Sequence, residues 1–146
     1  MSYRWELTDS PSGDDESAVS EGVFRFGRAL AADGRALPLA CFARDGETLV
    51  AGGIGRTEYG RLFVTYLWVA EHLRCRGLGT EVLRRMEAAA LARGCVDSLI
   101  ETLNDRIAGH YERLGYKPVA TVEAYVGPFS KHILVKSLVA AVARDG

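Results

Sequence analysis

Arginine and glycine crowd into a short stretch that directly precedes a helix-like run. The stretch reads RCRGLG, begins at Arg74 and is followed by Thr80. Gly77 and Gly79 lack a Cβ, so the backbone can approach a bulky anion closely. Arg74 and Arg76 add positive charge, and a guanidinium group binds phosphate oxygens in a bidentate way. The threonine adds a hydroxyl group. Together, these residues can bind a phosphate.

The elements around this loop would place the phosphate at a helix start. Residues 61–69, RLFVTYLWV, are β-branched and aromatic, which is typical of a buried strand. Residues 78–93 predict the clearest helix of the chain. Its apolar stripe has spacings of three and four and consists of Val82, Leu83, Met86, Ala89 and Ala90. The unpaired N–H groups in the first turn of a helix attract anions.

The loop has three other possible interpretations. The glycines can simply make a tight turn, with the arginines in solvent, and the loop alone fits this equally well. A dinucleotide site needs a third Gly or Ala, but Val82 occupies that position. A P-loop needs Gly-Lys, and this dipeptide does not occur. The anion is therefore not expected to be a nucleotide in either of those loops.

The remaining pattern predicts one domain over residues 1–146, of the α/β class. Further strands are expected at residues 2–7, 37–44, 48–55, 97–102, 117–125 and 131–137, and further helices at residues 14–32 and 107–114. Hairpin turns and one strand–helix–strand crossover predict a mixed, mostly antiparallel, twisted sheet. We expect six to seven strands with helices on both faces.

Composition excludes several classes of function. The net charge of −1 favours binding neither to nucleic acid nor to a membrane surface. Cys41, Cys75 and Cys95 are too widely spaced for a disulfide framework or a metal site, so no metal is expected. No apolar run is long enough to span a bilayer. The N-terminal residues lack the apolar core of a signal peptide, which predicts a cytoplasmic protein.

Two motifs resemble signatures of the GNAT superfamily of N-acetyltransferases. RCRGLG has the form Arg/Gln-x-x-Gly-x-Gly/Ala and resembles the motif that binds the pyrophosphate of acetyl-CoA. NDRIAGHYERLGYKPV is similar to a second signature, in which Asn104 stands seven residues before Tyr111. The resemblance runs from about residue 37 to the end. The tail VGPFSKHILVKSL resembles a bacterial branch, but ETLNDRI departs from the DTFSFQA of that branch, so its substrate is not carried over.

The resemblance implies a GNAT-like acyl-CoA N-acyltransferase fold with acetyl-CoA as co-substrate. The residues implied in coenzyme binding are Leu67, Trp68, Val69, Arg74, Cys75, Arg76, Gly77, Leu78, Gly79, Thr80, Asn104 and Tyr111. The pantetheine arm would pair with residues 67–69 as an added strand. The N–H of Val69 would stabilise the oxyanion. Asn104 would bond the pantetheine or cap the helix that follows it.

Tyr111 and Glu101 are the candidate catalytic residues. In a GNAT enzyme, Tyr111 would protonate the departing CoA thiolate; otherwise it is a tyrosine packed on the sheet. Glu101 lies near the end of a central strand, where ligands of α/β sheets gather, and is the first candidate for a general base. Alternatively, Glu101 has a structural role and forms a salt bridge with a nearby arginine. Glu71 and His132 are weaker candidates, and a water chain can replace a base.

The activity expected from the resemblance is acetyl transfer to a primary amine of a small molecule, by direct attack in a ternary complex. Two alternatives stay open: acetylation of a protein N-terminus or lysine, and a CoA-binding module without catalysis. Tyr111 argues against the last of these. The last two strands offer edges at which a homodimer can form.

Overall fold

The computed structural model describes residues 2–30 and 35–139. The chain divides into two compact units, Met1–Gly34 and Arg35–Gly146, and each is described by itself. The expectation of one domain over residues 1–146 stays a prediction.

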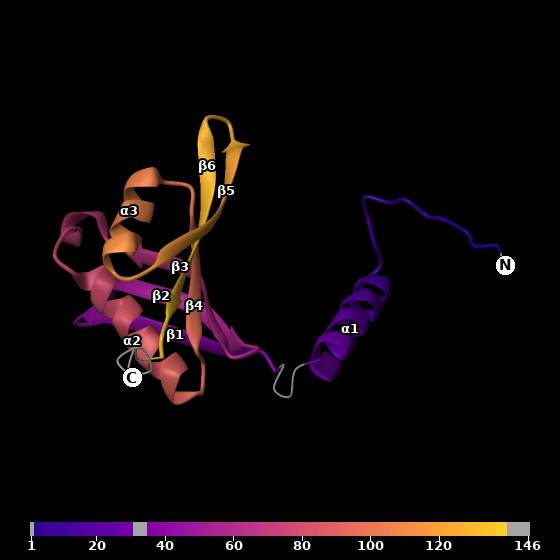
Figure 1. Ribbon diagram of the computed structural model, residues 1–146, viewed down its shortest axis with the longest axis horizontal. Coiled ribbons are helices and arrows are strands. Elements are labelled where there is room, and N and C mark those ends of the chain that lie inside the picture. The colour runs from indigo at the N-terminus through magenta and orange to yellow at the C-terminus, as the bar shows by residue number, and fades with distance from the viewer. Residues whose placement is uncertain (1, 31–34, 140–146) are drawn as a thin grey trace, which may run out of the picture. The chain divides into compact units, whose positions relative to one another are not determined.

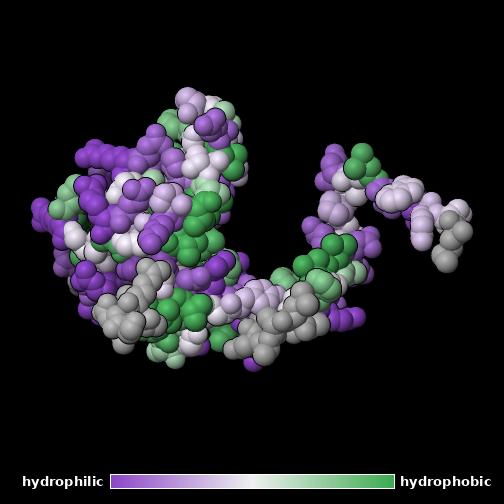
Figure 2. Space-filling model, viewed as in Figure 1, coloured by the Kyte–Doolittle hydropathy of each residue, from purple (hydrophilic) through white to green (hydrophobic). Residues whose placement is uncertain are grey.

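The first unit contains the predicted N-terminal helix, α1 (Gly13–Leu30). The Ser12 hydroxyl caps it, because Ser12 Oγ accepts from the N–H of Asp15 at 3.2 Å. The predicted last residues of the helix, 31 and 32, lie outside the described residues. Figure 2 shows apolar side chains on α1 among hydrophilic ones. The strand expected at residues 2–7 was a wrong prediction: no other segment described in this unit is a strand that could pair with it.

The second unit is a six-stranded sheet with the strand order β1-β2-β3-β4-β6-β5. The strands are β1 (Leu37–Asp45), β2 (Thr48–Glu58), β3 (Arg61–Val69), β4 (Asp97–Thr102), β5 (Lys117–Val126) and β6 (Phe129–Ser137). Among the described strands, only β3 and β4 pair in parallel; the other neighbouring strands are antiparallel. The predicted mixed, mostly antiparallel sheet is confirmed. Of the last two strands, only β5 lies at an edge.

Two helices of this unit cover one face of the sheet (Figure 1). Helix α2 (Leu78–Ala92) contacts β1, β2 and β3, and helix α3 (Asp105–Arg113) contacts β4, β5 and β6. The short 3-10 helix η1 (Glu71–Leu73) precedes the arginine–glycine loop. The apolar stripe predicted on α2 is buried in the core at Val82, Leu83, Met86 and Ala90. The predicted helix on the other face stays a prediction.

A bulge in β3 determines which residues face the helices. Ile54 of β2 pairs with Tyr66, but Gly55 pairs with Val64, so Thr65 is an extra residue. An extra residue reverses the alternation of side chains along the strand. Leu62 and Val64 before the bulge, and Leu67 and Val69 after it, therefore face the same side and contact the same core.

The same bulge marks the place where β3 and β4 separate. The parallel pairing joins Arg61–Val64 to Asp97–Ile100 and ends there. Residues 66–69 continue to pair with β2, but they have no pairing with β4. The edge of β3 that faces β4 is therefore open after the bulge. Unpaired strand edges can accept an added extended segment.

A buried polar cluster holds the helix face to the sheet. The Tyr116 hydroxyl lies 2.8 Å from Glu87 Oε2 of α2 and 2.9 Å from Ser98 Oγ of β4. Lys136 Nζ of β6 donates to Glu87 Oε1 at 2.9 Å. Glu87 is buried, and a buried carboxylate is stable only when it is paired and hydrogen-bonded.

Replacing Tyr116 by Phe is expected to lower the free energy of unfolding by about 1–3 kcal/mol, because it removes one donor to a buried carboxylate. Urea denaturation followed by circular dichroism measures the change. Tyr59→Phe is the control, since Tyr59 is exposed and its hydroxyl has no hydrogen bond within the described part of the chain. Equal stability of the two variants would contradict the assigned role.

Candidate active site

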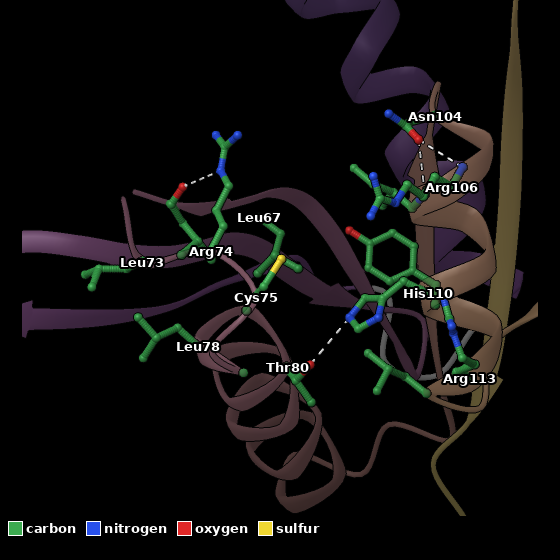
Figure 3. Close-up of a pocket in the computed structure, with 16 residues that line it drawn as sticks. Leu67, Leu73, Arg74, Cys75, Leu78, Thr80, Asn104, Arg106, His110 and Arg113 are labelled. Carbon is green, nitrogen blue, oxygen red and sulfur yellow. Dashed lines mark hydrogen bonds between the residues drawn. The ribbon is translucent and has the colours of Figure 1, made fainter. Parts of the chain in front are cut away.

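A cavity of about 640 Å³ opens between the end of β3, the first turn of α2 and helix α3 (Figure 3). The fold thus brings segments together that are far apart in the sequence. Most of the predicted coenzyme-binding residues line this cavity: Leu67, Val69, Arg74, Cys75, Gly77, Leu78, Gly79, Thr80, Asn104 and Tyr111.

The arginine–glycine loop has the backbone that its glycines predict. Gly77 caps α2 in the left-handed region, with φ of 83°. Its carbonyl accepts from the N–H of Glu81 at 3.0 Å, so the N–H groups of residues 78–80 precede the first intrahelical donor. At Gly79, an added Cβ would lie 3.3 Å from Val69 Cγ2. The loop therefore presents N–H groups and the positive end of the helix dipole to the cavity.

The open edge of β3 directs specific backbone groups into the same space. The N–H of Ala70 donates to the carbonyl of Val50 at 2.8 Å, so this pair is hydrogen-bonded. In an antiparallel ladder, hydrogen-bonded pairs alternate with pairs whose N–H and C=O groups point away from the partner strand. Val69, which pairs with Ala51, therefore turns its N–H away from β2, and Leu67 does the same two residues earlier. Arg74 Nε donates to the Val69 carbonyl at 3.2 Å.

Asn104 begins helix α3 and also lines the cavity. Its Oδ1 accepts from the N–H groups of Arg106 at 2.9 Å and Ile107 at 3.1 Å. The side-chain oxygen is thus an N-cap, which was one of the two roles expected for this residue. Its amide nitrogen points away from the helix (Figure 3).

Tyr111 projects from α3 into the cavity lining and is only 8% exposed. Burial raises the pKa of its phenol above the ordinary value. Its ring lies against that of Tyr116, with 6.0 Å between the ring centroids. The packing fixes the ring, and the phenol holds its proton at neutral pH, as a proton donor must. The group is therefore suited to donate a proton.

The family follows from comparison with known proteins. The Acetyltransferase (GNAT) family matches residues 2–116. The chain belongs to the GNAT family. It is therefore an acyltransferase, and the predicted family and enzyme class are confirmed.

Two curated relatives and one solved structure are similar to this GNAT acetyltransferase. Blasticidin-S acetyltransferase of Streptomyces morookaense is 38% identical over 68% of this chain and 72% of its own. An acetyltransferase of Agrobacterium fabrum is 29% identical over 85% of this chain and 88% of its own. A crystal structure of a putative acetyltransferase from Agrobacterium tumefaciens superposes with a TM-score of 0.82 at 26% identity, covering 92% of this chain and 99% of that one.

Three of the residues predicted for the site of this GNAT acetyltransferase do not line the cavity. Trp68 is in the hydrogen-bonded register with Gly52, so its backbone groups face β2, and its side chain is 47% exposed. Arg76 is exposed and does not line the cavity. Glu101 forms a salt bridge with Lys131 at 2.8 Å, where the sequence suggested an arginine. Because Ile100 is buried toward the helices, Glu101 projects from the opposite face of the sheet.

One wall of the cavity was not predicted from the sequence. Helix α3 and its end contribute Arg106, Ile107, His110, Arg113 and Leu114. These positions recur at spacings of three and four, so they form one helix face. The stripe mixes charged and apolar side chains, which hides it from an analysis of apolar periodicity.

Two further findings concern the described part of this GNAT protein. No helix found there is long and apolar enough to cross a membrane. Within residues 2–30 and 35–139, no group of three or more His, Cys, Asp or Glu side chains is placed to hold a metal ion.

Proposed function

We propose that this acetyltransferase moves the acetyl group of acetyl-CoA to a primary amine of a small molecule, by direct attack in a ternary complex. The observation that carries the proposal is the meeting of an anion-binding helix start, an open strand edge and a buried tyrosine in one cavity. These features fit the three parts of the co-substrate: the pyrophosphate, the pantetheine arm and the thiol. A relative named for blasticidin S supports a small-molecule acceptor.

The pyrophosphate belongs at the first turn of α2. There the N–H groups of residues 78–80 have no intrahelical partner, and Gly79 leaves room beside Val69. The guanidinium group of Arg74 lies at the same loop and can bind phosphate oxygens. From this position, the pantetheine arm extends along the open edge of β3, where Leu67 and Val69 present N–H and carbonyl groups.

The chemistry requires an oxyanion donor and an acid. The N–H of Val69 points to the open edge and would stabilise negative charge on the thioester oxygen as the amine attacks. As the tetrahedral centre collapses, the C–S bond breaks, and Tyr111 would give its proton to the thiolate sulfur. A single oxyanion donor typically accelerates such reactions about 100- to 1000-fold.

The attacking amine must lose a proton, and Glu101 remains our candidate base. Pairing between β3 and β4 ends at Ile100, so the sheet is open at the next residue. Glu101 stands there on the face opposite α3, and its side chain is 42% exposed. An amine that enters from that face would meet Glu101 before the thioester. Lys131 lies 2.8 Å away and orients the carboxylate.

Replacing Glu101 by Gln is expected to lower kcat/KM about 100-fold at neutral pH, because the amine then loses its general base. The loss should shrink as the pH rises, since more of the amine is already neutral in solution. Initial rates of CoA release between pH 6 and 10 test this. Glu123→Gln is the matched control, because Glu123 is an exposed glutamate of β5. An unchanged pH profile for Glu101→Gln would assign proton removal to water.

The proposed activity is tested by CoA release from acetyl-CoA with a panel of amines. The panel should contain small amines, including amine-bearing antibiotics, and short peptides with free N-termini or lysines. Turnover of a small amine supports the proposal. Turnover of peptides alone favours a protein acetyltransferase. Tight CoA binding without turnover of any amine favours a binding module and overturns the proposal.

A further inference from the structure

Positive charge lines the cavity on both walls. Arg74 lies at the loop, and Arg106, Arg113 and the basic residue His110 lie on α3, whereas none of the Asp and Glu residues that the structure describes lines the cavity. Elsewhere in this unit, cations such as Arg61 are paired with carboxylates. Among the side chains that the structure describes, no ion pair joins any of the three cavity arginines to a carboxylate. The cavity thus holds more available positive charge than a pyrophosphate alone requires.

The α3 cations divide between the two ends of the cavity. Arg106 is in the first turn of α3, beside Asn104, and Arg113 is its last residue. Seven residues separate them on one face, which is about 10 Å along a helix. His110 Nε2 lies 3.5 Å from Thr80 Oγ1 of α2. His110 and Arg113 therefore lie at the end that carries the first turn of α2 (Figure 3).

The chemistry of the coenzyme places a second anion at that end. The proposed site holds the pyrophosphate at residues 78–80, with the thioester end directed along β3. The other side of the pyrophosphate carries a ribose, whose 3′-phosphate has close to two negative charges at neutral pH. A single ribose separates the two anionic groups. A 3′-phosphate on that side would reach the α3 wall beside Thr80, where His110 and Arg113 line the cavity.

We propose that Arg113 and His110 bind this 3′-phosphate and make the enzyme select acetyl-CoA over coenzyme forms that lack it. The proposal rests on the proposed function, because it assumes that the cavity binds the coenzyme. The C-terminal end of a helix repels anions, so the backbone of α3 does not favour a phosphate there. Binding must come from the two side chains, and Arg113 can form a bidentate contact with the phosphate.

The test compares two ligands that differ only in the 3′-phosphate. Dissociation constants for CoA and 3′-dephospho-CoA are measured by isothermal titration calorimetry. Wild type should bind CoA about tenfold more tightly, the effect of one charge-assisted contact. Arg113→Gln should remove most of this preference by weakening the binding of CoA, and it should leave the binding of 3′-dephospho-CoA unchanged. Arg113 is exposed, so this substitution does not disturb the core.

Arg106→Gln is the matched control, since it removes the same charge from the other end of the cavity. It should retain the wild-type ratio of the two dissociation constants. Equal binding of both ligands to wild type, or an undiminished preference for CoA in Arg113→Gln, overturns the assignment of the 3′-phosphate while the proposed function stands. Failure of wild type to bind either ligand overturns the proposed function itself.

Discussion

Tyr111→Phe should lower kcat about 1000-fold while the dissociation constant for CoA stays nearly unchanged. The substitution removes only the hydroxyl that would protonate the leaving thiolate, and general acids typically contribute 100- to 10,000-fold. The ring keeps its buried position against Tyr116, so the fold is retained. Steady-state kinetics and calorimetry on the same preparation separate the two effects. A fall in CoA affinity that accounts for the whole loss would make Tyr111 a binding residue.

The pH profile offers an independent test of the same role. Burial raises the pKa of Tyr111 above its ordinary value of 10.0. The donor must be protonated, so wild-type kcat should persist through about pH 10 and fall only as the pH passes the raised pKa. In Tyr111→Phe this loss at high pH should be absent. Tyr59→Phe, a substitution at an exposed tyrosine, should behave as wild type.

Gly79→Asp should weaken acetyl-CoA binding at least 100-fold. An added Cβ lies 3.3 Å from Val69 Cγ2, and the carboxylate would occupy the place proposed for the pyrophosphate. Two unit charges about 4 Å apart repel by about 4 kcal/mol at an effective dielectric constant of about 20, which exceeds the loss required. Thermal unfolding with and without acetyl-CoA measures binding, because a ligand of the native state raises Tm.

Unfolding of the variant would not explain such a result. Gly79 is in the first turn of α2, where an acidic side chain favours the helix. The matched control is Gly109→Asp in α3, since an added Cβ there meets nothing within 4 Å and Gly109 does not line the cavity. It should keep the full ligand-induced shift in Tm. A shift that persists in Gly79→Asp would mean that the pyrophosphate binds elsewhere.

Local pattern was sufficient to predict most elements of the second unit. The strands at residues 61–69 and 97–102 and the start of α2 were predicted as observed, because period-two and period-3.6 patterns depend only on neighbouring residues. The prediction of a strand at residues 2–7 was wrong because a strand needs a partner strand, and a short segment of sequence does not reveal whether one exists.

The coenzyme motifs are also local, since Gly77 and Gly79 act through backbone conformation and Asn104 through the turn that follows it. The sequence by itself thus determined the family, the backbone conformation of the arginine–glycine loop and the sheet class. Tertiary structure alone decided the rest. The extra residue Thr65, the open edge at Val69, the pairing of Glu101 with Lys131 and the approach of Arg113 to the cavity all depend on register and packing between distant segments. Such contacts have no local period, so no short pattern encodes them.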